Sequence, residues 1–348
     1  MATVLIADDS RVIRTRVASW ISREQDLDLV GQAEDGRGCI DLFRRLRPDL
    51  VVLDIEMPGL DGITTLRQIR AIDPRVPVIM FSALTESGSR MTVAAMLAGA
   101  TDYVPKPLSF RVEDETRRTL VARIRSLVGR DETTPHTSRR EPAVEVAQTP
   151  RVRQSPDLIV VASSTGGPAA LGEFLRALGR VQPPVVIVQH MQPGFLELLV
   201  AQLAEMLSGD VAVGRNGEIL APGSIRFAPS GVHLQVHRHR GHFGLSCVEG
   251  PPVNSCRPAA DILFSSVASC ARRPVGVVLS GMGTDGLQGA QRIAASGGVV
   301  VAQDRATSAV WGMPGVVVEQ GLARLVGSPG KLGSRVRVLA ESKHPASA

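Results

Sequence analysis

The sequence predicts an α/β protein built from two doubly wound, mostly parallel sheets. In both halves of the chain, short apolar segments of strand length alternate with segments of helical period, and the connections between them are short. The length of 348 residues suits two domains that each bury a core of their own. The 44% of hydrophobic and 21% of charged residues are ordinary for such a globular protein.

The first half of the chain contains five strand–helix units. Its predicted strands are residues 3–7, 29–33, 50–54, 77–81 and 102–104. The predicted helices that follow them are residues 10–24, 38–46, 62–72, 88–98 and 111–128. Five units with short connections predict a parallel sheet covered by helices on both faces.

The periodicity stops after this half. Between residues 129 and 156, prolines occur among Thr, Arg, Glu and Gln, and the segment has too little apolar surface to offset the entropy cost of ordering it. We therefore predict a first domain of residues 1–128, a flexible linker of residues 129–156 and a second domain of residues 157–348.

The second half resumes the alternation. Its predicted strands are residues 158–162, 185–189, 225–228, 275–279 and 299–303, and its predicted helices are residues 169–178, 196–207, 259–270 and 286–295. Residues 233–248 are typical of an antiparallel hairpin with its turn near Arg240 and Gly241. This pattern predicts a second mostly parallel sheet with an inserted antiparallel piece.

Composition argues against several classes of protein. No apolar run approaches the roughly 20 residues of a membrane span, and the first residues lead into a strand without a basic signal region, so we expect a cytoplasmic protein. The net charge of +5 is compatible with nucleic-acid binding, but the arginines are scattered and aromatic residues are only 3%, which leaves few surfaces for base stacking. The cysteines lack paired spacing and are expected to be reduced, structural thiols: Cys39, Cys247, Cys256 and Cys270.

Charged and hydroxyl side chains follow the predicted strands of the first domain. Asp8 and Asp9 follow the first strand, Asp54 ends the third, Ser82 follows the fourth, and Lys106 follows the fifth. In a doubly wound sheet these strand ends converge on one crevice. Paired carboxylates suit Mg²⁺, and a third carboxylate beside the ion can accept a phosphoryl group while a lysine neutralises charge. Any one of these groups alone would be merely solvated, but together they predict a phosphoryl-accepting site.

The segments VLIADDS (4–10), DIEMPGLDG (54–62) and YVPKP (103–107) resemble the receiver domain of two-component response regulators, over residues 1 to about 128. The resemblance implies a flavodoxin-like (βα)5 fold and phosphorylation of Asp54 by a partner histidine kinase. It implies that Mg²⁺ is held by Asp8, Asp9, Asp54 and the carbonyl of Glu56. It also implies a conformational relay of Ser82, Tyr103 and Lys106. Without the resemblance, Tyr103 could simply be a half-buried aromatic on an edge strand.

A second set of reactive groups follows three strands of the second domain. Ser164 lies in the turn between the strand at 158–162 and the next helix, beside helix N-terminal amides that favour developing negative charge. This turn alone could equally bind phosphate or cap the helix. His190 and Asp285 follow two further parallel strands, and alone they would be a satisfied histidine and a helix cap. Together the three strand ends offer a hydroxyl, an imidazole and a carboxylate for attack on an acyl carbon.

Six segments of the second half resemble the catalytic domain of the chemotaxis methylesterase (CheB) family: STGGP (164–168), QHM (189–191), APSGVH (228–233), RPAADILF (257–264), GMGTDG (281–286) and WGMP (311–314). The resemblance implies that Ser164 attacks glutamate γ-methyl esters of chemoreceptors and releases methanol, without a cofactor. His190 would act as the base and Asp285 would hold its tautomer. The amides near Thr165 and Met282 are candidates for an oxyanion hole, and deamidation of receptor glutamine is a further implied activity.

Two positions depart from the family pattern. Ala162 and Ser163 stand where the family usually has Gly-Ala, which places a second hydroxyl beside Ser164. Side chains alternate at a strand end, so Ser163 is expected to turn away from the crevice that Ser164 faces. Leu196 stands where the family usually has threonine, a difference that affects substrate detail rather than chemistry.

A rival cluster of possible metal ligands lies in the predicted hairpin, near Cys247. His237 and His239 fall on one face of a strand, where they could bind a metal ion. The cluster lacks carboxylates and paired cysteines, which weakens this hypothesis. Its members are His233, His237, His239 and His242.

The sequence therefore predicts a response regulator whose output is an esterase. The receiver is expected to pack over or near the Ser164 crevice, and phosphorylation of Asp54 to favour an open, active state. The expected partners are a histidine kinase and methylated chemoreceptors, with no nucleic acid and no direct membrane insertion. Two alternatives are a phosphorylation-dependent scaffold with an inactive esterase domain and a transcriptional regulator, although no recognition-helix pattern supports the latter.

Overall fold

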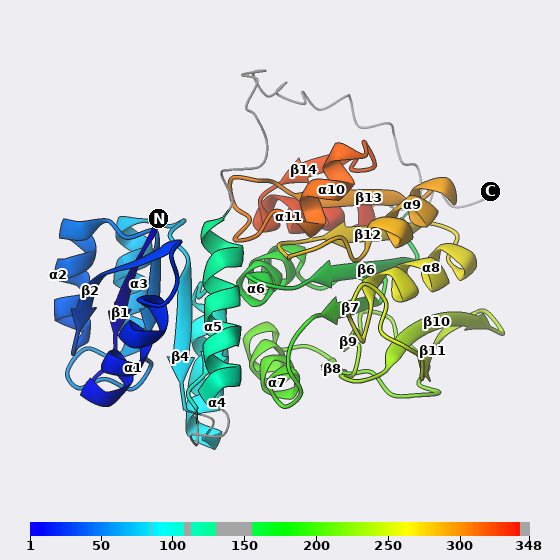
Figure 1. Cartoon of the computed structure of the whole chain (residues 1–348). Helices are drawn as coiled ribbons and strands as arrows, with labels where there is room; N and C mark the ends of the chain where they lie inside the picture. The colour runs from blue at the N-terminus through cyan, green and yellow to red at the C-terminus, as the bar shows by residue number, and fades with distance from the viewer. Residues whose placement is uncertain (84, 108–112, 130–154, 342–348) are drawn as a thin grey trace. The chain divides into compact units, whose positions relative to one another are not determined.

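The computed structural model describes residues 1–83, 85–107, 113–129 and 155–341 (Figure 1). By its internal contacts the chain divides into two compact units, Met1–Arg140 and Glu141–Ala348. Apart from residues 129, 155 and 156, the predicted linker lies outside the described residues.

The first unit is a five-stranded parallel sheet with the strand order β2-β1-β3-β4-β5. Its strands are β1 (Ala2–Ala7), β2 (Leu27–Ala33), β3 (Leu50–Leu53), β4 (Val78–Ser82) and β5 (Asp102–Pro105). Its helices are α1 (Arg11–Ile21), α2 (Gly36–Leu46), α3 (Gly62–Ile72), α4 (Glu86–Leu97) and α5 (Glu113–Val128). The chain runs outward from β1 to β2 and then returns to β3 on the other side of β1. This switch in direction opens a crevice at the carboxyl ends of β1 and β3.

Local sequence explains where these elements begin. The four residues of β3 are fully buried and apolar, as expected for a central strand covered on both faces. Side-chain caps start α1 to α3: Ser10 accepts a hydrogen bond from an amide of α1, Asp35 from α2, and Asp61 from α3. The predicted strands are confirmed to within two residues, whereas α1 ends at Ile21 rather than Glu24 because the chain turns there.

The second unit contains a seven-stranded sheet that is entirely parallel, with the order β14-β13-β12-β6-β7-β9-β8. Its strands are β6 (Leu158–Ser163), β7 (Val185–Gln189), β8 (Val211–Val213), β9 (Ile225–Phe227), β12 (Pro274–Val278), β13 (Val299–Gln303) and β14 (Leu325–Gly327). Its helices are α6 (Gly167–Leu178), α7 (Phe195–Leu207), α8 (Ala260–Cys270), α9 (Leu287–Ala295), α10 (Met313–Glu319) and α11 (Pro329–Glu341). The central strand β6 lies between β12 and β7, so the turns after these three strands are neighbours.

The predicted hairpin is confirmed as a separate antiparallel sheet of β10 (His233–His239) and β11 (His242–Val248). At its tip, Arg240 and Gly241 both have positive φ, 49° and 88°. Two such residues in succession are typical of the tight turn that matches the twist of two paired strands. The hairpin lies beside α8, whose Ser266 hydroxyl accepts a hydrogen bond from the amide of Val236 in β10 (Figure 1).

Four elements of the second unit have no counterpart in the sequence-based prediction. The strands β8 and β14 have three residues each, lie at the two edges of the sheet and are mostly only partly buried, so their hydrophobic pattern is weak. The helix α10 has seven residues and begins with a proline in its first turn. The longer helix α11 packs against α6 and buries Leu332 and Val336.

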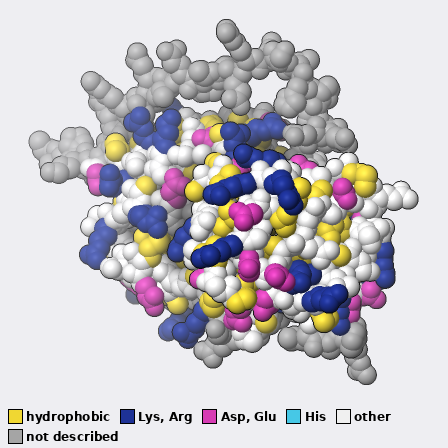
Figure 2. Space-filling view, turned by 90° about the vertical axis from the view of Figure 1, so that its left-hand side faces the viewer, with side chains coloured by type: hydrophobic (Ala, Val, Ile, Leu, Met, Phe, Trp, Pro, Cys, Tyr) yellow, Lys and Arg dark blue, Asp and Glu magenta, His cyan; other side chains and the backbone are white. Residues whose placement is uncertain are grey.

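Charge on the visible surface is mixed. Figure 2 shows a face on which basic and acidic side chains are interspersed with apolar ones, so the positive charges do not gather into one basic surface there. Among the described residues, no helix is both long enough and apolar enough to cross a membrane.

Candidate active site and acidic site

The acidic site of the first unit is built around one lysine. The Lys106 ammonium, just after β5, lies 2.8 Å from a carboxylate oxygen of Asp8 and 2.7 Å from one of Asp54. Asp8 follows β1 and Asp54 follows β3, and both carboxylates are almost fully buried. The strand ends that the sequence predicted to converge are therefore in direct contact.

The buried setting changes the protonation of these groups. Burial raises the pKa of Asp54 to about 6, because the Lys106 ammonium and the hydrogen bond from the Ile55 amide offset the loss of solvation only in part. Burial likewise raises the pKa of Asp8. Burial works against a charged Lys106, but its two carboxylate partners outweigh this effect and raise its pKa. An added positive charge would favour both carboxylates in their ionised form.

Asp9 completes an acidic cluster that is typical of a Mg²⁺ site. Carboxylate oxygens of Asp8, Asp9 and Asp54 lie within 4.8 Å of one another, and Asp9 is exposed. A small cation that prefers oxygen ligands and keeps part of its water shell fits such a set. Glu56 is expected to contribute its backbone carbonyl to the ion, and its side chain is exposed to solvent.

The loop after Asp54 passes very close to it. A Cβ atom at Gly62, the first residue of α3, would overlap the carbonyl oxygen of Asp54. The Gly62 amide instead donates to the carbonyl of Ile55 at 2.9 Å. Glycine at this position therefore allows α3 to start directly against the strand end that carries Asp54.

The predicted relay residues lie on the two strands beyond β3. The buried Ser82 hydroxyl, at the end of β4, lies 2.7 Å from the Thr92 hydroxyl of α4. Thr92 donates its single proton to the Gly88 carbonyl, so Ser82 is the donor in this pair. Tyr103 lies partly buried on the edge strand β5 and packs against the core. Ser82 is thus linked to α4.

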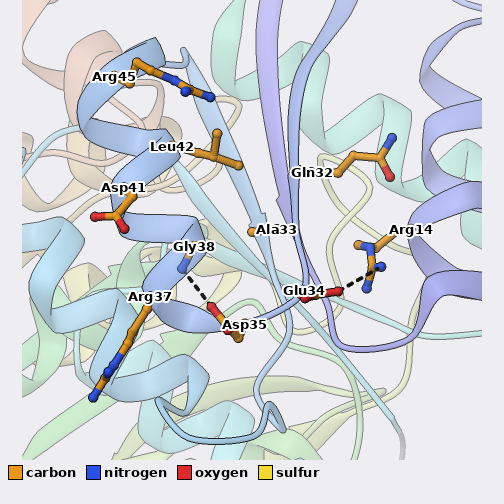
Figure 3. A pocket seen from close by; sticks show the side chains of 10 residues that line it. All are labelled: Arg14, Gln32, Ala33, Glu34, Asp35, Arg37, Gly38, Asp41, Leu42 and Arg45. Carbon is orange, nitrogen blue, oxygen red and sulfur yellow. Dashed lines mark hydrogen bonds and ion pairs between the residues drawn. The ribbon is translucent and has the colours of Figure 1, made fainter.

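A hollow of about 720 Å³ lies beside α2 and the end of β2 (Figure 3). Arg14 forms part of its wall and lies 3.9 Å from Glu34. The same guanidinium donates to the backbone carbonyls of Asp8 and Asp9 at 2.7 and 3.0 Å. Arg14 therefore braces the turn that presents these two carboxylates, and the hollow carries charges of both signs rather than a single ligand chemistry.

The candidate active site of the second unit lies where β6, β7 and β12 end. Ser164 is the first residue after β6, and its amide donates to the carbonyl of Ser280 at 2.9 Å. The amide of His190, directly after β7, donates to the carbonyl of Ser163 at 3.0 Å. These bonds continue the hydrogen-bond ladder of the sheet into the turns, so the turns have little freedom to move independently.

Asp285 is held as an anion at the start of α8. Its Oδ2 accepts from the Ala260 amide at 2.7 Å, and its Oδ1 accepts from the Asp261 and Gly286 amides at 3.1 and 3.0 Å. The amides at a helix N-terminus favour negative charge. Although burial works against the carboxylate, the hydrogen bonds from His190 and Ala260 lower the pKa of Asp285.

His190 is oriented by this carboxylate. Its Nε2 lies 2.9 Å from Asp285 Oδ2, and its side chain is 14% exposed. Since Asp285 accepts, Nε2 carries the proton and Nδ1 is the nitrogen left to accept one. Burial disfavours the imidazolium, but the hydrogen bonds to Asp285 and Cys256 outweigh it and raise the pKa of His190 to about 9.

The two adjacent serines point in different directions, as predicted. Ser163 is completely buried and donates to Gln189 Oε1 at 2.6 Å. Gln189 in turn donates from Nε2 to the carbonyls of Ser164 and His190, at 3.0 Å each. Ser164 is partly exposed. Ser163 and Gln189 therefore form a buried support under Ser164 that the sequence analysis missed.

Other predicted positions around Ser164 differ in exposure. Thr165 is buried and its carbonyl accepts from the Ser280 hydroxyl at 2.8 Å, whereas Met282 is 38% exposed. Leu196, where the family usually has threonine, is buried in the first turn of α7 and belongs to the core. A Cβ atom at Gly281 would lie 2.9 Å from the Ser164 Cβ, so the turn after β12 approaches Ser164 as closely as a glycine allows.

The loop before α8 adds residues that the sequence analysis did not assign to the site. Asn254 donates to both Asp261 and Asp285, at 2.8 and 3.3 Å. Cys256 Sγ lies 3.7 Å from His190 Nδ1. All four cysteines are free thiols, and Cys256 also donates to the carbonyl of Asn254 at 3.4 Å. A loop far from Ser164 in sequence gives no local signal of this proximity.

The hairpin histidines do not form the predicted rival metal cluster. The buried His233 contacts the Pro251 carbonyl at 2.9 Å and accepts from the Ala259 amide at 3.2 Å, so both its nitrogens have structural partners. His237 contacts the Ser246 hydroxyl. Within the described part of the chain, the groups of three or more possible metal ligands are Asp8 with Asp9 and Asp54, and His190 with Cys256 and Asp285.

The first unit has a receiver fold with an acidic site, and the second is an α/β unit with Ser, His and Asp at adjacent strand ends. Together they define a response regulator with a hydrolase output. Residues 4–114 match the response regulator receiver domain, and residues 159–336 match CheB methylesterase. The chain belongs to the CheB methylesterase family, which excludes the transcriptional alternative.

Relatives match along nearly the whole chain. A protein from Nocardioides sp. named protein-glutamate methylesterase/protein-glutamine glutaminase is 44% identical and is matched over 93% of this chain and 91% of its own length. One from Rhodopseudomonas palustris, of the same name with the addition "of group 2 operon", is 37% identical over 96% of this chain and 93% of its own. The crystal structure of the Thermotoga maritima CheB methylesterase catalytic domain is similar with a TM-score of 0.51 and 33% identity, covering 53% of this chain and 99% of that one.

Proposed function

We propose that the protein hydrolyses glutamate γ-methyl esters of chemoreceptors and deamidates receptor glutamines, under control of its receiver. Family membership supports the reaction class. The observation that carries the assignment of residues is the 2.9 Å contact between His190 Nε2 and an Asp285 carboxylate anchored by the amides of α8, next to the turn that holds Ser164. The reaction takes place in the cytoplasm, where the methylated receptor domains are the substrate.

The chemistry follows from the proton positions. His190 Nδ1 accepts the Ser164 hydroxyl proton as Oγ attacks the ester carbonyl, and Asp285 stabilises the imidazolium that forms. The carbonyl oxygen becomes an oxyanion, for which the amides of Thr165 and Met282 are the proposed donors. His190 then protonates the departing methoxide as methanol, or the departing amide as ammonia, and leaves an acyl-enzyme. A water molecule attacks this ester while His190 takes its proton and then passes that proton to Ser164 Oγ, which regenerates Ser164 and leaves a glutamate carboxylate on the receptor.

The first unit is proposed to switch this reaction. Asp54 accepts a phosphoryl group from a histidine kinase, and Mg²⁺ held by Asp8, Asp9, Asp54 and the Glu56 carbonyl would neutralise charge on the phosphoryl oxygens. Lys106 lies 2.7 Å from Asp54 and supplies a fixed positive charge. Ser82 and Tyr103 respond to the modified carboxylate, with Ser82 linked to α4 through Thr92.

The test is methanol release from a methylated receptor cytoplasmic domain, measured with and without Mg²⁺ and a small phosphodonor. Wild type is compared with Ser164→Ala and with Ser163→Ala as a matched control. We expect release to require Ser164, to survive the loss of Ser163, and to rise with the phosphodonor. Release that is unchanged in Ser164→Ala would overturn the nucleophile. No release from any receptor would favour the scaffold alternative.

A further inference from the structure

The proposed ester hydrolysis uses His190 and Asp285 but gives no role to Cys256. The thiol is partly exposed, and its sulfur lies 3.7 Å from His190 Nδ1, the nitrogen that would accept the Ser164 proton. One ligand atom from each of His190, Cys256 and Asp285 lies within 4.8 Å of the other two. A soft sulfur, an imidazole and a carboxylate are the ligand types that zinc sites use.

The spacing of sulfur and nitrogen fits a shared ion. A tetrahedral ion with a Zn–S distance of about 2.3 Å and a Zn–N distance of about 2.0–2.1 Å separates the two ligand atoms by about 3.5–3.6 Å. The observed separation of Cys256 Sγ and His190 Nδ1 is 3.7 Å. Both side chains could therefore bind one ion almost without moving.

The groups behind His190 also fit this arrangement. A metal-binding histidine usually donates its second ring N–H to a carboxylate, which fixes the tautomer. His190 Nε2 makes this contact with Asp285 Oδ2 at 2.9 Å, and Asp285 is itself held by the Ala260 amide. The imidazole thus already presents Nδ1 toward Cys256.

The Cys256 side is fixed by a tight turn. Val253 and Cys256 exchange two backbone hydrogen bonds, of 3.0 and 2.9 Å. Between them, Asn254 and Ser255 adopt the left-handed conformation, with φ of 51° and 62°. Non-glycine residues rarely adopt this conformation and are enriched in it at functional sites. The sulfur is therefore held in place rather than carried on a loose loop.

We propose that His190 Nδ1 and Cys256 Sγ form an inhibitory site for a thiophilic divalent cation such as Zn²⁺, with Asp285 holding the imidazole from its other side and water completing the shell. A cation bound to Nδ1 removes the base that Ser164 needs. The thiolate selects Zn²⁺ over Mg²⁺, which prefers oxygen ligands, so the two units respond to different metals. The inhibition rests on the proposed role of His190, but the binding of the ion does not.

The test separates binding from activity. Full-length, reduced protein is freed of transition metals and kept in excess Mg²⁺, then titrated with Co²⁺, and the thiolate-to-cobalt charge-transfer absorption is recorded. Wild type is compared with Cys256→Ala, with Cys256→Ser, which keeps a side chain of similar size, and with Cys247→Ala, which removes the thiol beside the hairpin histidines. We expect the absorption in wild type and Cys247→Ala and its loss in both Cys256 variants.

Inhibition is measured as methanol release with added Zn²⁺, relative to the metal-free rate of each variant. We expect Cys256→Ala to require at least a ten-fold higher Zn²⁺ concentration for half inhibition than wild type or Cys247→Ala. Equal absorption and equal sensitivity in the Cys256 variants and wild type would overturn the site, as would a loss confined to Cys247→Ala. If no variant releases methanol, the proposed function fails, while the cobalt absorption still decides the metal site.

Discussion

Replacing Asp285 by asparagine tests the charge that orients His190. Asparagine keeps the size of the side chain but turns one carboxylate oxygen into a donor. If the asparagine NH2 takes the place of Oδ2, it faces the Ala260 N–H and donates to His190 Nε2. The histidine proton must then lie on Nδ1. If the asparagine NH2 instead takes the place of Oδ1, it faces the Asp261 and Gly286 amides. In the first orientation the histidine is in the wrong tautomer, and in both orientations buried donors lose their acceptor.

The magnitudes follow from these contacts. Loss of one buried acceptor costs about 1–3 kcal/mol, and loss of negative charge at the N-terminus of α8 adds about 0.3–1 kcal/mol. We therefore expect the second unit to be destabilised by about 1–4 kcal/mol, visible as a lower urea midpoint. The same substitution in a serine–histidine–aspartate set lowers kcat on the order of 10⁴-fold through the wrong tautomer. We expect kcat for methanol release to fall by about 10³–10⁴-fold.

Asp157→Asn is the matched control. Asp157 accepts from the Arg272 and Arg273 amides at 3.0 Å each, but it lies at the amino end of β6, on the opposite edge of the sheet. It should lower the urea midpoint and leave kcat within a few-fold of wild type. If folded Asp285→Asn keeps kcat within ten-fold of wild type, the charge of Asp285 does not set the activity of His190. The same conclusion holds if Asp157→Asn loses as much activity as Asp285→Asn.

Three further predictions concern pH and two single positions. The pKa of His190 is raised from 6.5 to about 9, so kcat/KM should rise with pH through about 9. Because the hydrogen bond to Cys256 contributes to the raised pKa, Cys256→Ala should move this rise to lower pH. A pH–rate profile that is the same in Cys256→Ala and wild type would contradict this prediction. Because the folded pKa is the higher one, this proton stabilises the fold fully below pH 6.5, and the contribution is lost as pH rises through about 9. The Cβ added by Gly281→Ala would lie 2.3 Å from Met313 Sδ and 2.9 Å from Ser164 Cβ. The change should therefore displace Ser164 and slow methanol release by about 10²-fold with an unchanged circular dichroism spectrum, whereas a wild-type rate would show that Met313 and the turn adapt. Lys106→Ala removes the ion pairs at the acidic site, so the ratio of rates with and without phosphodonor should fall toward one, and an undiminished ratio would contradict the role of Lys106.

The sequence predicted the parts of the fold that have strong periodicity. The central strands and most helices were predicted correctly because each strand is a buried apolar run and each helix is an amphipathic segment long enough to show its period. The strands β8 and β14 were missed because they are short edge strands that are mostly only partly buried, so they lack the continuous apolar run of a central strand. The hairpin was predicted correctly because Arg240 and Gly241 suit its turn.

The candidate sites divide in the same way. Asp8, Asp54 and Lys106 could be placed together because each follows a strand of one parallel sheet, and parallel topology alone brings such positions together. The same reasoning joined His190 to Asp285. Cys256 and Asn254 could not be found this way, because their loop belongs to no strand end and reaches the site only through tertiary packing.

The backbone bonds between the turns after β6, β7 and β12 have a consequence for hydrogen exchange and for regulation. The amide of Ser164 is bonded to the turn after β12, and that of His190 is bonded to the last residue of β6, so their exchange requires the centre of the sheet to open. These amides should exchange about as slowly as those of β6 itself. Any rearrangement of the Ser164 backbone would therefore have to break hydrogen bonds at the centre of the sheet, whereas the access of substrate to Ser164 can change without breaking them.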